Sequence, residues 1–569
     1  MIRKCKDYTT DVLIIGSGSA GLWAAHSVKK ENPDSSVIIV DKGPDCWGGL
    51  MTFAGGDLDI VMPNEDIEEW IKDWVYYYDG LCDQKLMKKL FENSYEILEQ
   101  YQKWGCEYLK DSNGSMDNIG IPQRGLEHIK LYVTKIKGSG GLRMTKALVK
   151  AIKEQHVNSL GRTLITDLIK NDKGRIIGAV GFNTIDGTLV KINAKAVLLA
   201  TGMAGFKPSY MENTSTGEGI YMAFKAGAEL RNVEFGSVWN VPKLFSWEGQ
   251  TTLLPLGAKF VNAQGEDFMS RYSKTLGCNT DVHYITLGMA MEMRAGRGPI
   301  YFDTSAVSDE NAAVVLPKMG WQYINYQRLK EQGIDFFNTK TEWMPQLLDN
   351  YCGLIADLDG ATRVPGLYAA GRCRSVDPGV YTGGFALATT ATSGVIAGKS
   401  MAKYIADKTI EEISDEEVSK IGDTLFAPMQ KKGIPPKEVF RNIQSILFPY
   451  DVSIIKSETS LTNALHKIES LKEELLPQMS ADDPHFLMKY KETEATAFIA
   501  EWYIKASLMR KESRCGHFRE DYPDHKDDWL KWIVLSLENG KAGLHTVPVP
   551  IDEYDHKIEK YYQDNFKFL

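Results

Sequence analysis

A glycine-rich turn near the start of the chain constrains the fold more than any other stretch. It reads GSGSAG over residues 16–21 and follows an apolar run at residues 12–15, which is typical of a buried parallel strand. Helix-like sequence follows Gly21, and a second apolar run ends at Asp41, 20 residues later. Glycines let the backbone approach a pyrophosphate at a helix N-terminus, and an acidic residue at this spacing binds a ribose hydroxyl. The stretch therefore predicts a dinucleotide-binding βαβ unit rather than a turn that binds nothing.

Charge and cysteine spacing exclude several other classes of protein. The 569 residues include 66 Lys and Arg against 75 Asp and Glu, and the formal net charge of −9 argues against a nucleic-acid-binding surface. No apolar run reaches the roughly 18 residues that a membrane span needs, and the first strand begins too early for a secretory signal. The eight cysteines form no C-x-x-C pair, so we expect neither a metal site nor an iron–sulfur cluster in this chain. These features predict a cytoplasmic protein.

The order of strand-like and helix-like patterns predicts a nucleotide-binding domain that is interrupted and later completed. Residues 64–109 have a helical pattern, and two strand-like runs follow before a third at residues 194–202. A middle section rich in aromatic residues follows, after which glycine-rich strand and helix patterns return. We therefore expect an α/β protein with a discontinuous Rossmann-like nucleotide-binding domain over residues 1–235 and 349–410, an inserted α+β domain over 236–348, and a C-terminal helical domain over 411–569.

The order of sequence motifs along the chain also carries a family resemblance. These motifs are GSGSAG with VDK, GGLMTFAGGDLD, AKAVLLATG, MEMRAGRGPIYFD, VPGLYAAGRC and KESRCGHFREDYP. In this order they resemble the flavoprotein subunits of succinate dehydrogenase and fumarate reductase, with their relatives L-aspartate oxidase and the adenylylsulfate reductase flavoprotein. The resemblance implies an FAD-dependent oxidoreductase in which FAD lies extended across the split domain and the inserted domain closes over the flavin.

By the same resemblance, residues from several parts of the split domain would bind FAD. The three glycines of the first turn would face the pyrophosphate, and Asp41 the adenosine ribose. Other glycines would be needed where the backbone approaches the flavin ring. The expected set is Gly16, Gly18, Ser19, Ala20, Gly21, Asp41, Lys42, Gly48, Gly49, Thr52, Gly55, Gly56, Ala200, Thr201, Gly202, Gly217, Glu218, Gly371, Arg372 and Ala388.

Three positions in this set depart from the family pattern. Glu218 stands where the family usually has Asp, and Arg372 where it usually has Glu or Asp. An arginine beside the flavin would favour an anionic reduced ring or bind an acidic ligand, unless it is a salt-bridged structural residue. The membrane-bound members attach FAD through a histidine, and Gly49 stands at about that place, so we expect noncovalent FAD.

The residues that handle fumarate in this family are also replaced. The resemblance places Thr280 where fumarate reductases have the arginine that transfers the proton, and Phe385 where a second arginine anchors the substrate. Asp349 stands where a histidine usually precedes the motif NYCGL. Since threonine is a weak acid, phenylalanine cannot hold a carboxylate and aspartate repels a dianion, we expect no meaningful interconversion of fumarate and succinate.

Four residues are candidates for the substrate site. His283 is close in sequence to the missing arginine, and histidine is a residue type that suits proton transfer, although a packed helix histidine is equally compatible with its position. Trp239 would suit a planar or nucleotide-like substrate, with a core tryptophan as the alternative. Arg271 and Arg372 could supply positive charge.

The combined features predict the catalytic flavoprotein of an oxidoreductase. It would exchange electrons between an unidentified small-molecule substrate and a separate iron–sulfur, ferredoxin-like subunit, because the chain has no cluster motif of its own. Two alternatives stay open at this point. One is an adenylylsulfate-reductase-like flavoprotein, and the other is a flavin electron relay whose substrate site has degenerated.

Overall fold

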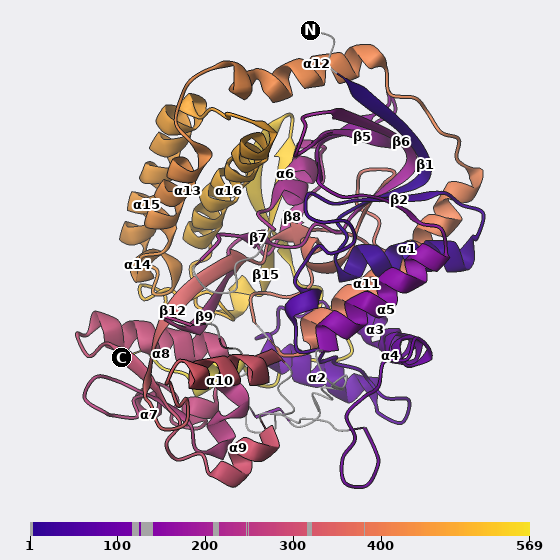
Figure 1. The fold of residues 1–569 in the computed structure, drawn as a ribbon. Helices are drawn as coiled ribbons and strands as arrows, with labels where there is room; N and C mark the ends of the chain where they lie inside the picture. The colour runs from indigo at the N-terminus through magenta and orange to yellow at the C-terminus, as the bar shows by residue number, and fades with distance from the viewer. Residues whose placement is uncertain are drawn as a thin grey trace.

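A computed structural model gives the fold of residues 4–116, 125–126, 140–208, 215–245, 247, 250–315, 321–380 and 382–568 (Figure 1). Three sheets with their covering helices make up this part of the chain. Among the helices described, none combines the length and the apolar character that crossing a membrane would require.

The largest sheet holds the predicted βαβ unit. Strand β1 (Cys5–Ile15) leads through helix α1 (Ser19–Glu31) into the parallel strand β2 (Val37–Val40). The sheet continues with β3 (Asn158–Leu160), β4 (Thr163–Lys170), β5 (Ile176–Asn183), β6 (Leu189–Leu199) and β14 (Leu367–Ala369). Its strand order is β3-β2-β1-β6-β5-β4, and β14 pairs with β6. The chain therefore returns to this sheet after the inserted segment, as a discontinuous domain requires.

Both faces of β1 are buried, which explains its continuous apolar run. Val12 and Ile14 pack in one core, and Leu13 and Ile15 pack in the other. Helix α11 (Phe385–Tyr404) covers the first of these cores and lies against α1. The two helices can approach closely because residue 394 is a glycine. A Cβ atom at this position would lie only 2.4 Å from the carbonyl oxygen of Ala20. This close packing fixes the N-termini of both helices relative to the sheet.

The inserted segment and the short strand β7, which precedes it, form a second, five-stranded antiparallel sheet. Its strands are β7 (Ala204–Gly205), β9 (Gly236–Pro242), β10 (Lys259–Val261), β11 (Ile300–Asp303) and β12 (Thr341–Asn350). The order is β10-β11-β12-β7, and β9 also pairs with β12. Helices α7 (Met269–Tyr272), α8 (Val282–Arg294), α9 (Asp309–Val315) and α10 (Trp321–Glu331) lie at the lower left of Figure 1.

The predicted helical stretch at residues 64–109 contains three helices, and two more helices follow it along the chain. They are α2 (Ile67–Tyr77), α3 (Gln84–Glu92), α4 (Ser94–Lys103), α5 (Gly140–Glu154) and α6 (Glu218–Lys225). Asp66 and Asp83 cap α2 and α3, since their side chains accept hydrogen bonds from backbone N–H groups of the first turn.

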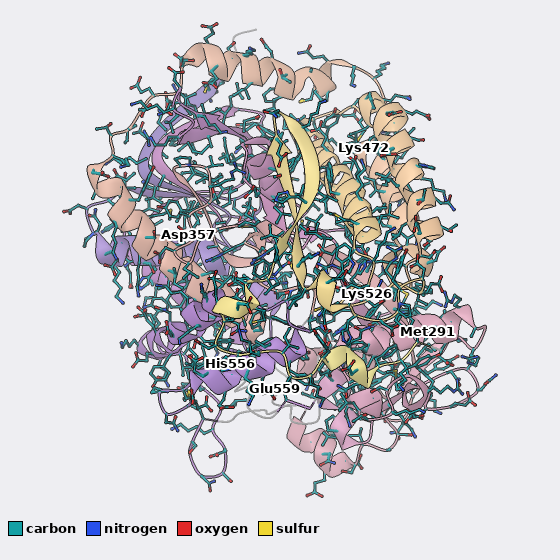
Figure 2. All side chains as sticks on the ribbon, turned by 180° about the vertical axis from the view of Figure 1, so that it is seen from behind. Met291, Asp357, Lys472, Lys526, His556 and Glu559 are labelled. Atoms are coloured by element: carbon teal, nitrogen blue, oxygen red, sulfur yellow. The ribbon has the colours of Figure 1, made fainter. Side chains whose placement is uncertain are left out.

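The C-terminal region is helical as expected but also contains a β-hairpin. Its helices are α12 (Asp415–Phe426), α13 (Pro436–Leu447), α14 (Tyr450–Ser453), α15 (Glu458–Ser470) and α16 (Pro484–Met509). Strands β15 (Lys531–Glu538) and β16 (Lys541–Pro548) then form the hairpin drawn in yellow in Figure 2, which follows the segment around Lys526. With β8 (Leu230–Arg231) and β13 (Gly353–Leu354) they make a sheet of order β13-β8-β15-β16.

Candidate cofactor and substrate site

A cavity of about 390 Å³ lies at the carboxyl ends of the central parallel strands. Ile15 and Val40, the last residues of β1 and β2, line it together with the glycine turn. Trp239 from β9 and Arg372 from the returning segment line it as well. One cavity therefore joins the predicted dinucleotide site to the inserted segment.

The glycine turn leaves room beside the start of α1. A Cβ atom at Gly18 would meet only the backbone of Gly48 and Gly49, at 3.9 and 3.7 Å, so a larger side chain would extend into open space. Among the described residues, no side chain caps α1 at Gly18, and the buried hydroxyl of Ser19 has no hydrogen-bond partner. The first N–H groups of α1 and this hydroxyl are hydrogen-bond donors of the kind that an anion such as a diphosphate requires.

Gly21 has a different task in the same turn. Its Cβ atom would lie 2.0 Å from the carbonyl oxygen of Gly16, so only glycine allows this packing of the helix start on the turn. Gly16 itself has a positive φ of 109°. Gly16 lines the cavity and Gly21 does not, which matches the separate roles of the first and third glycines in a dinucleotide-binding turn.

Asp41 is fixed at the end of β2 by three hydrogen bonds. Its carboxylate accepts from the backbone N–H and the hydroxyl of Ser17, at 2.7 and 2.8 Å, and from the backbone N–H of Gly43 at 2.7 Å. Gly48 passes close by, since a Cβ atom there would lie 2.1 Å from an Asp41 oxygen. A carboxylate held this way keeps lone pairs for the hydroxyl groups of a ribose.

Lys42 ties the cavity to the C-terminal helices. Its buried ammonium forms ion pairs with Glu218 and with Glu492 of α16, the latter at 2.9 Å. Burial alone would lower the pKa of Lys42, but the two carboxylates outweigh it and raise that pKa. Lys207 also pairs with Glu492, whose pKa is lowered by the three nearby lysines against the effect of burial. Lys42 therefore holds α16 against the cavity and is not free to bind a phosphate.

Most of the expected cofactor residues line the cavity. These are Gly16, Gly18, Ser19, Ala20, Asp41, Lys42, Gly49, Gly55, Ala200, Thr201, Gly202, Glu218, Gly371 and Arg372. The structure does not place Gly21, Gly48, Thr52, Gly56, Gly217 and Ala388 in the lining. Sequence reasoning missed other lining residues, among them Gly383 and Gly384, which precede α11 as Gly18 precedes α1. A glycine pair directly before a helix was the available signal for them.

Polar and aromatic side chains outside the glycine turn also line the cavity. Ser237 and Trp239 come from β9, and Asp349 pairs with Ser237 across the ladder between β9 and β12. Tyr351 follows β12, and the Arg372 guanidinium lies over its ring at 4.8 Å from the centroid. Arg372 forms an ion pair with the buried carboxylate of Asp377. The positive charge of Arg372 is thus neutralised within the protein.

Asp349 has an unusual protonation equilibrium. Burial raises the pKa of Asp349 to about 7, and the nearby carboxylate of Asp377 also raises it. Arg372 and the Ser237 hydroxyl act in the opposite direction. Within the described part of the chain, one oxygen of Asp349 has no hydrogen-bond partner. This carboxyl group can therefore hold or release a proton near neutral pH.

The structure does not bring His283 or Arg271 to the cavity. His283 Nδ1 lies 2.6 Å from Asp281 Oδ1, and its ring stacks on Phe518 with 5.9 Å between centroids. Its neighbour Val282 lines the cavity instead. Arg271 is engaged by Glu266 and by Glu292, the latter at 3.0 Å. Local acidic partners hold both candidates away from the position that sequence proximity predicted.

No described cation takes the place of the arginines that the family resemblance places at residues 280 and 385. Phe385 packs against Trp74 with 4.6 Å between ring centroids. Thr280 is buried, and its hydroxyl has no hydrogen-bond partner in the protein. Among the described lining residues only Lys42 and Arg372 are cations, and both are paired with carboxylates.

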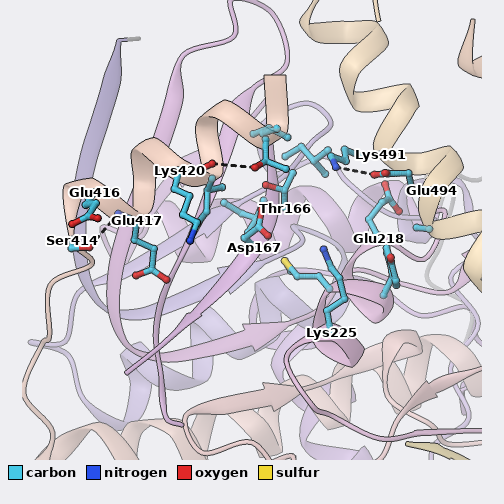
Figure 3. A pocket seen from close by; sticks show the side chains of 18 residues that line it. Thr166, Asp167, Glu218, Lys225, Ser414, Glu416, Glu417, Lys420, Lys491 and Glu494 are labelled. Atoms are coloured by element: carbon cyan, nitrogen blue, oxygen red, sulfur yellow. Dashed lines mark hydrogen bonds and ion pairs between the residues drawn. The ribbon is translucent and has the colours of Figure 1, made fainter. Parts of the chain in front are cut away.

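A second, more open cavity of about 630 Å³ adjoins the first near Glu218 (Figure 3). The two share Leu164, Ile165, Glu218 and Met222. Three lysines and five acidic residues line the second cavity, and Lys491 pairs with Glu494 at 2.8 Å. The excess of carboxylates and the lack of a glycine turn in the lining argue against a second phosphate site.

The fold and this cavity define a flavin-binding oxidoreductase, and comparison with known proteins gives its family. Residues 11–387 match the FAD binding domain family, and residues 442–561 match the fumarate reductase flavoprotein C-terminal family. The first match alone covers more than half of the chain. The chain therefore belongs to the FAD-dependent oxidoreductases of the fumarate reductase and succinate dehydrogenase family, and FAD is its cofactor.

Individual relatives extend over nearly the whole chain. One subunit of the CoM/CoB fumarate reductase from Methanothermobacter marburgensis is 27% identical over 556 residues, which cover 93% of this chain and 97% of that protein. Quinol fumarate reductase from E. coli superposes with a TM-score of 0.86 at 20% identity, covering 98% of this chain and 99% of the other. Adenylylsulfate reductase from Archaeoglobus fulgidus gives 0.79 at 22% identity, with 96% and 97% covered.

Proposed function

We propose that the chain is the catalytic flavoprotein of an oxidoreductase that passes electrons between a small-molecule substrate and a separate iron–sulfur protein. One observation carries this proposal. The cavity that contains the dinucleotide-binding turn continues to a cluster of polar and aromatic side chains, which the cofactor turn itself does not require. An electron relay with a degenerate substrate site would not require this additional space in the cavity.

The residues of the chain divide into those that fit FAD and those that fit a substrate. The α1 N-terminus with Gly18 and Ser19 fits the diphosphate, and Asp41 fits the adenosine ribose. When bound, FAD supplies hydride transfer. Trp239 on β9 and Asp349 on β12 line the same cavity, where they would contact and orient the substrate.

An iron–sulfur partner is proposed because the chain has no cluster motif of its own. Its eight cysteines are scattered, without a C-x-x-C pair. The relative from Methanothermobacter marburgensis is named as one subunit of its enzyme, so that protein works within an assembly. We infer the same arrangement for this chain.

Fumarate and succinate are not the proposed substrates. Turnover of a dicarboxylate requires cations that hold both carboxylates and a group that transfers the proton. The described lining offers only paired cations, and Asp349 adds negative charge when ionised. Losing one preorganised charged group typically costs about 10²–10³ in rate. We therefore expect turnover of fumarate to be below detection.

An anaerobic assay with the purified holoenzyme tests this function. The flavin is reduced with a viologen, candidate oxidants are added one at a time, and flavin absorbance is followed. We expect no reoxidation by fumarate, and reoxidation by at least one uncharged compound from a broad panel. Rapid reoxidation by fumarate would show that the substrate site is misassigned. A flavin that exchanges electrons with a ferredoxin but with no small molecule would support the relay instead.

A further inference from the structure

Asp349 is a buried carboxyl group whose bonding is incomplete at the substrate end of the cavity. It is 7% exposed, lies near the end of β12 and lines the cavity. Its side chain shares a face of the sheet with Ser237. The Oδ1 atom has no hydrogen-bond partner among the residues that the structure describes, and a buried acceptor left without a partner costs free energy. A ligand in the cavity is the group that can satisfy it.

The charged and titratable groups around Asp349 leave room for one proton. Arg372 faces it but forms its ion pair with Asp377, so two carboxyl groups surround a single guanidinium. Tyr351 and Cys352 are the other titratable neighbours, and burial raises the pKa of each, which keeps both neutral. A cluster with two carboxyl groups and one cation is most stable when one carboxyl group is protonated. Asp349, with its free oxygen on the cavity, is the group that can exchange this proton.

We propose that Asp349 transfers a proton to and from the substrate, and that the substrate is uncharged where it contacts this residue. The inference rests on the proposed function, namely that the cavity takes a small molecule beside FAD. Hydride transfer, which bound FAD would supply, accounts for two electrons and one hydrogen of the reaction. When a substrate is oxidised, a second hydrogen leaves an adjacent atom as a proton, and the Asp349 carboxylate accepts it. In the reverse direction the Asp349 acid returns that proton.

The same geometry selects the class of substrate. A carboxylate in this cavity would meet Asp349 and only the already paired guanidinium of Arg372. An alcohol, an amine or a carbonyl compound can hydrogen-bond to Asp349 in one of its two protonation states. Trp239 and Phe53 add aromatic surface to the lining, which suits a flat and partly apolar molecule.

Infrared pH-difference spectroscopy of the ligand-free holoenzyme tests the proton-transfer role directly. We expect a carboxylic acid band that titrates near pH 7 and is lost in Asp349→Asn. The matched control is Asp359→Asn, whose carboxylate is exposed and lies in a loop outside the cavity, and this variant should keep the band. Asp349→Glu keeps a carboxyl group and should retain the band with a shifted midpoint. This result would show that the band is lost in Asp349→Asn because the carboxyl group is missing and not because the variant is misfolded. A band that persists unchanged in folded, FAD-containing Asp349→Asn would overturn the proposal.

Two ligands with the same carbon skeleton test the charge preference. Dimethyl succinate and succinate are titrated into the oxidised holoenzyme, and binding is followed by the shift in flavin absorbance. We expect the diester to bind at least about ten-fold more tightly at pH 8, and Asp349→Asn to reduce this preference because it removes the repelling charge. Equal or tighter binding of succinate by the wild type would overturn the charge assignment. The proposed function fails by a different result, the absence of any small-molecule oxidant in the anaerobic assay.

Discussion

At the scale of single residues, Gly18 decides whether the cofactor can bind without deciding whether the chain folds. Its missing Cβ atom faces space with ordinary contact distances, so Gly18→Leu should leave the fold intact and fill the position of the diphosphate. We expect purified Gly18→Leu to be colourless, with a normal circular dichroism spectrum. Gly543→Leu on β16 is the control, because a Cβ atom there meets nothing within 4 Å and the site is far along the chain from the cavity. A yellow Gly18→Leu protein with full FAD content would refute the assignment of this turn.

Asp349 also predicts how stability depends on pH. The ordinary pKa of an aspartate is 3.8, and burial raises that of Asp349 to about 7. Between these two pH values the folded protein holds a proton on Asp349 that the unfolded chain has released. The protonated carboxyl group therefore contributes to the stability of the fold below about pH 4, and this contribution is lost as pH rises to about 7. The slope is at most about 1.4 kcal/mol per pH unit. Thermal unfolding measured at pH 5 and at pH 8 should show that Asp349→Asn loses less stability between these pH values than the wild type does. An equal loss of stability would contradict the raised pKa.

At the scale of elements, α16 supports the cofactor cavity through one glutamate. Glu492 is buried, with 2% of its side chain exposed, and pairs with Lys42 and Lys207. Removing one partner from a buried ion pair costs about 3–5 kcal/mol, because the remaining charges stay buried. Glu492→Gln should therefore lower the melting temperature and speed the release of FAD on dilution. Glu494→Gln, two residues along the same helix, breaks only the partly exposed pair with Lys491 and should change neither property measurably.

The elements that sequence patterns predict well are those whose signal is local. The βαβ unit and the strands at residues 163–170, 176–183 and 189–199 follow directly from apolar runs and glycine turns. The hairpin of β15 and β16 was not predicted, although it also has a local signal. Asn539 and Gly540 stand between two strand-like runs, and both have positive φ, as a two-residue hairpin turn requires.

The substrate end of the site could not be predicted in the same way. Closeness in sequence to a missing arginine favours His283, but Val282 lines the cavity instead. Consecutive helix residues point about 100° apart, so the residue that faces the cavity depends on how α8 docks on β9 and β12. This docking depends on contacts between distant parts of the chain. The sequence marks Asp349 only as a replaced histidine, and its raised pKa follows from burial that the sequence does not show.

At the scale of the whole molecule, the cofactor should be removable without breaking a covalent bond. Gly49 lines the cavity at about the place where membrane-bound relatives carry a histidine linked to FAD, and glycine offers no atom for such a link. Acid precipitation should therefore leave a colourless protein pellet and release all flavin into the supernatant. Flavin fluorescence that stays with the washed pellet, or with the protein band on a denaturing gel, would show a covalent attachment elsewhere.

The return of the chain to its first sheet has a consequence for the order of events during synthesis. Gly16 and Arg372 line the same cavity, although 356 residues separate them along the chain. A ribosome that adds about 5–20 residues per second needs roughly 20–70 s to cover that interval. Once residue 199 has been added, β1 and β6 are complete, while β14, the neighbour of β6, is still to be made. The flavin site of the nascent protein is thus incomplete during most of translation. We therefore expect FAD to bind late, after the returning segment has been synthesised.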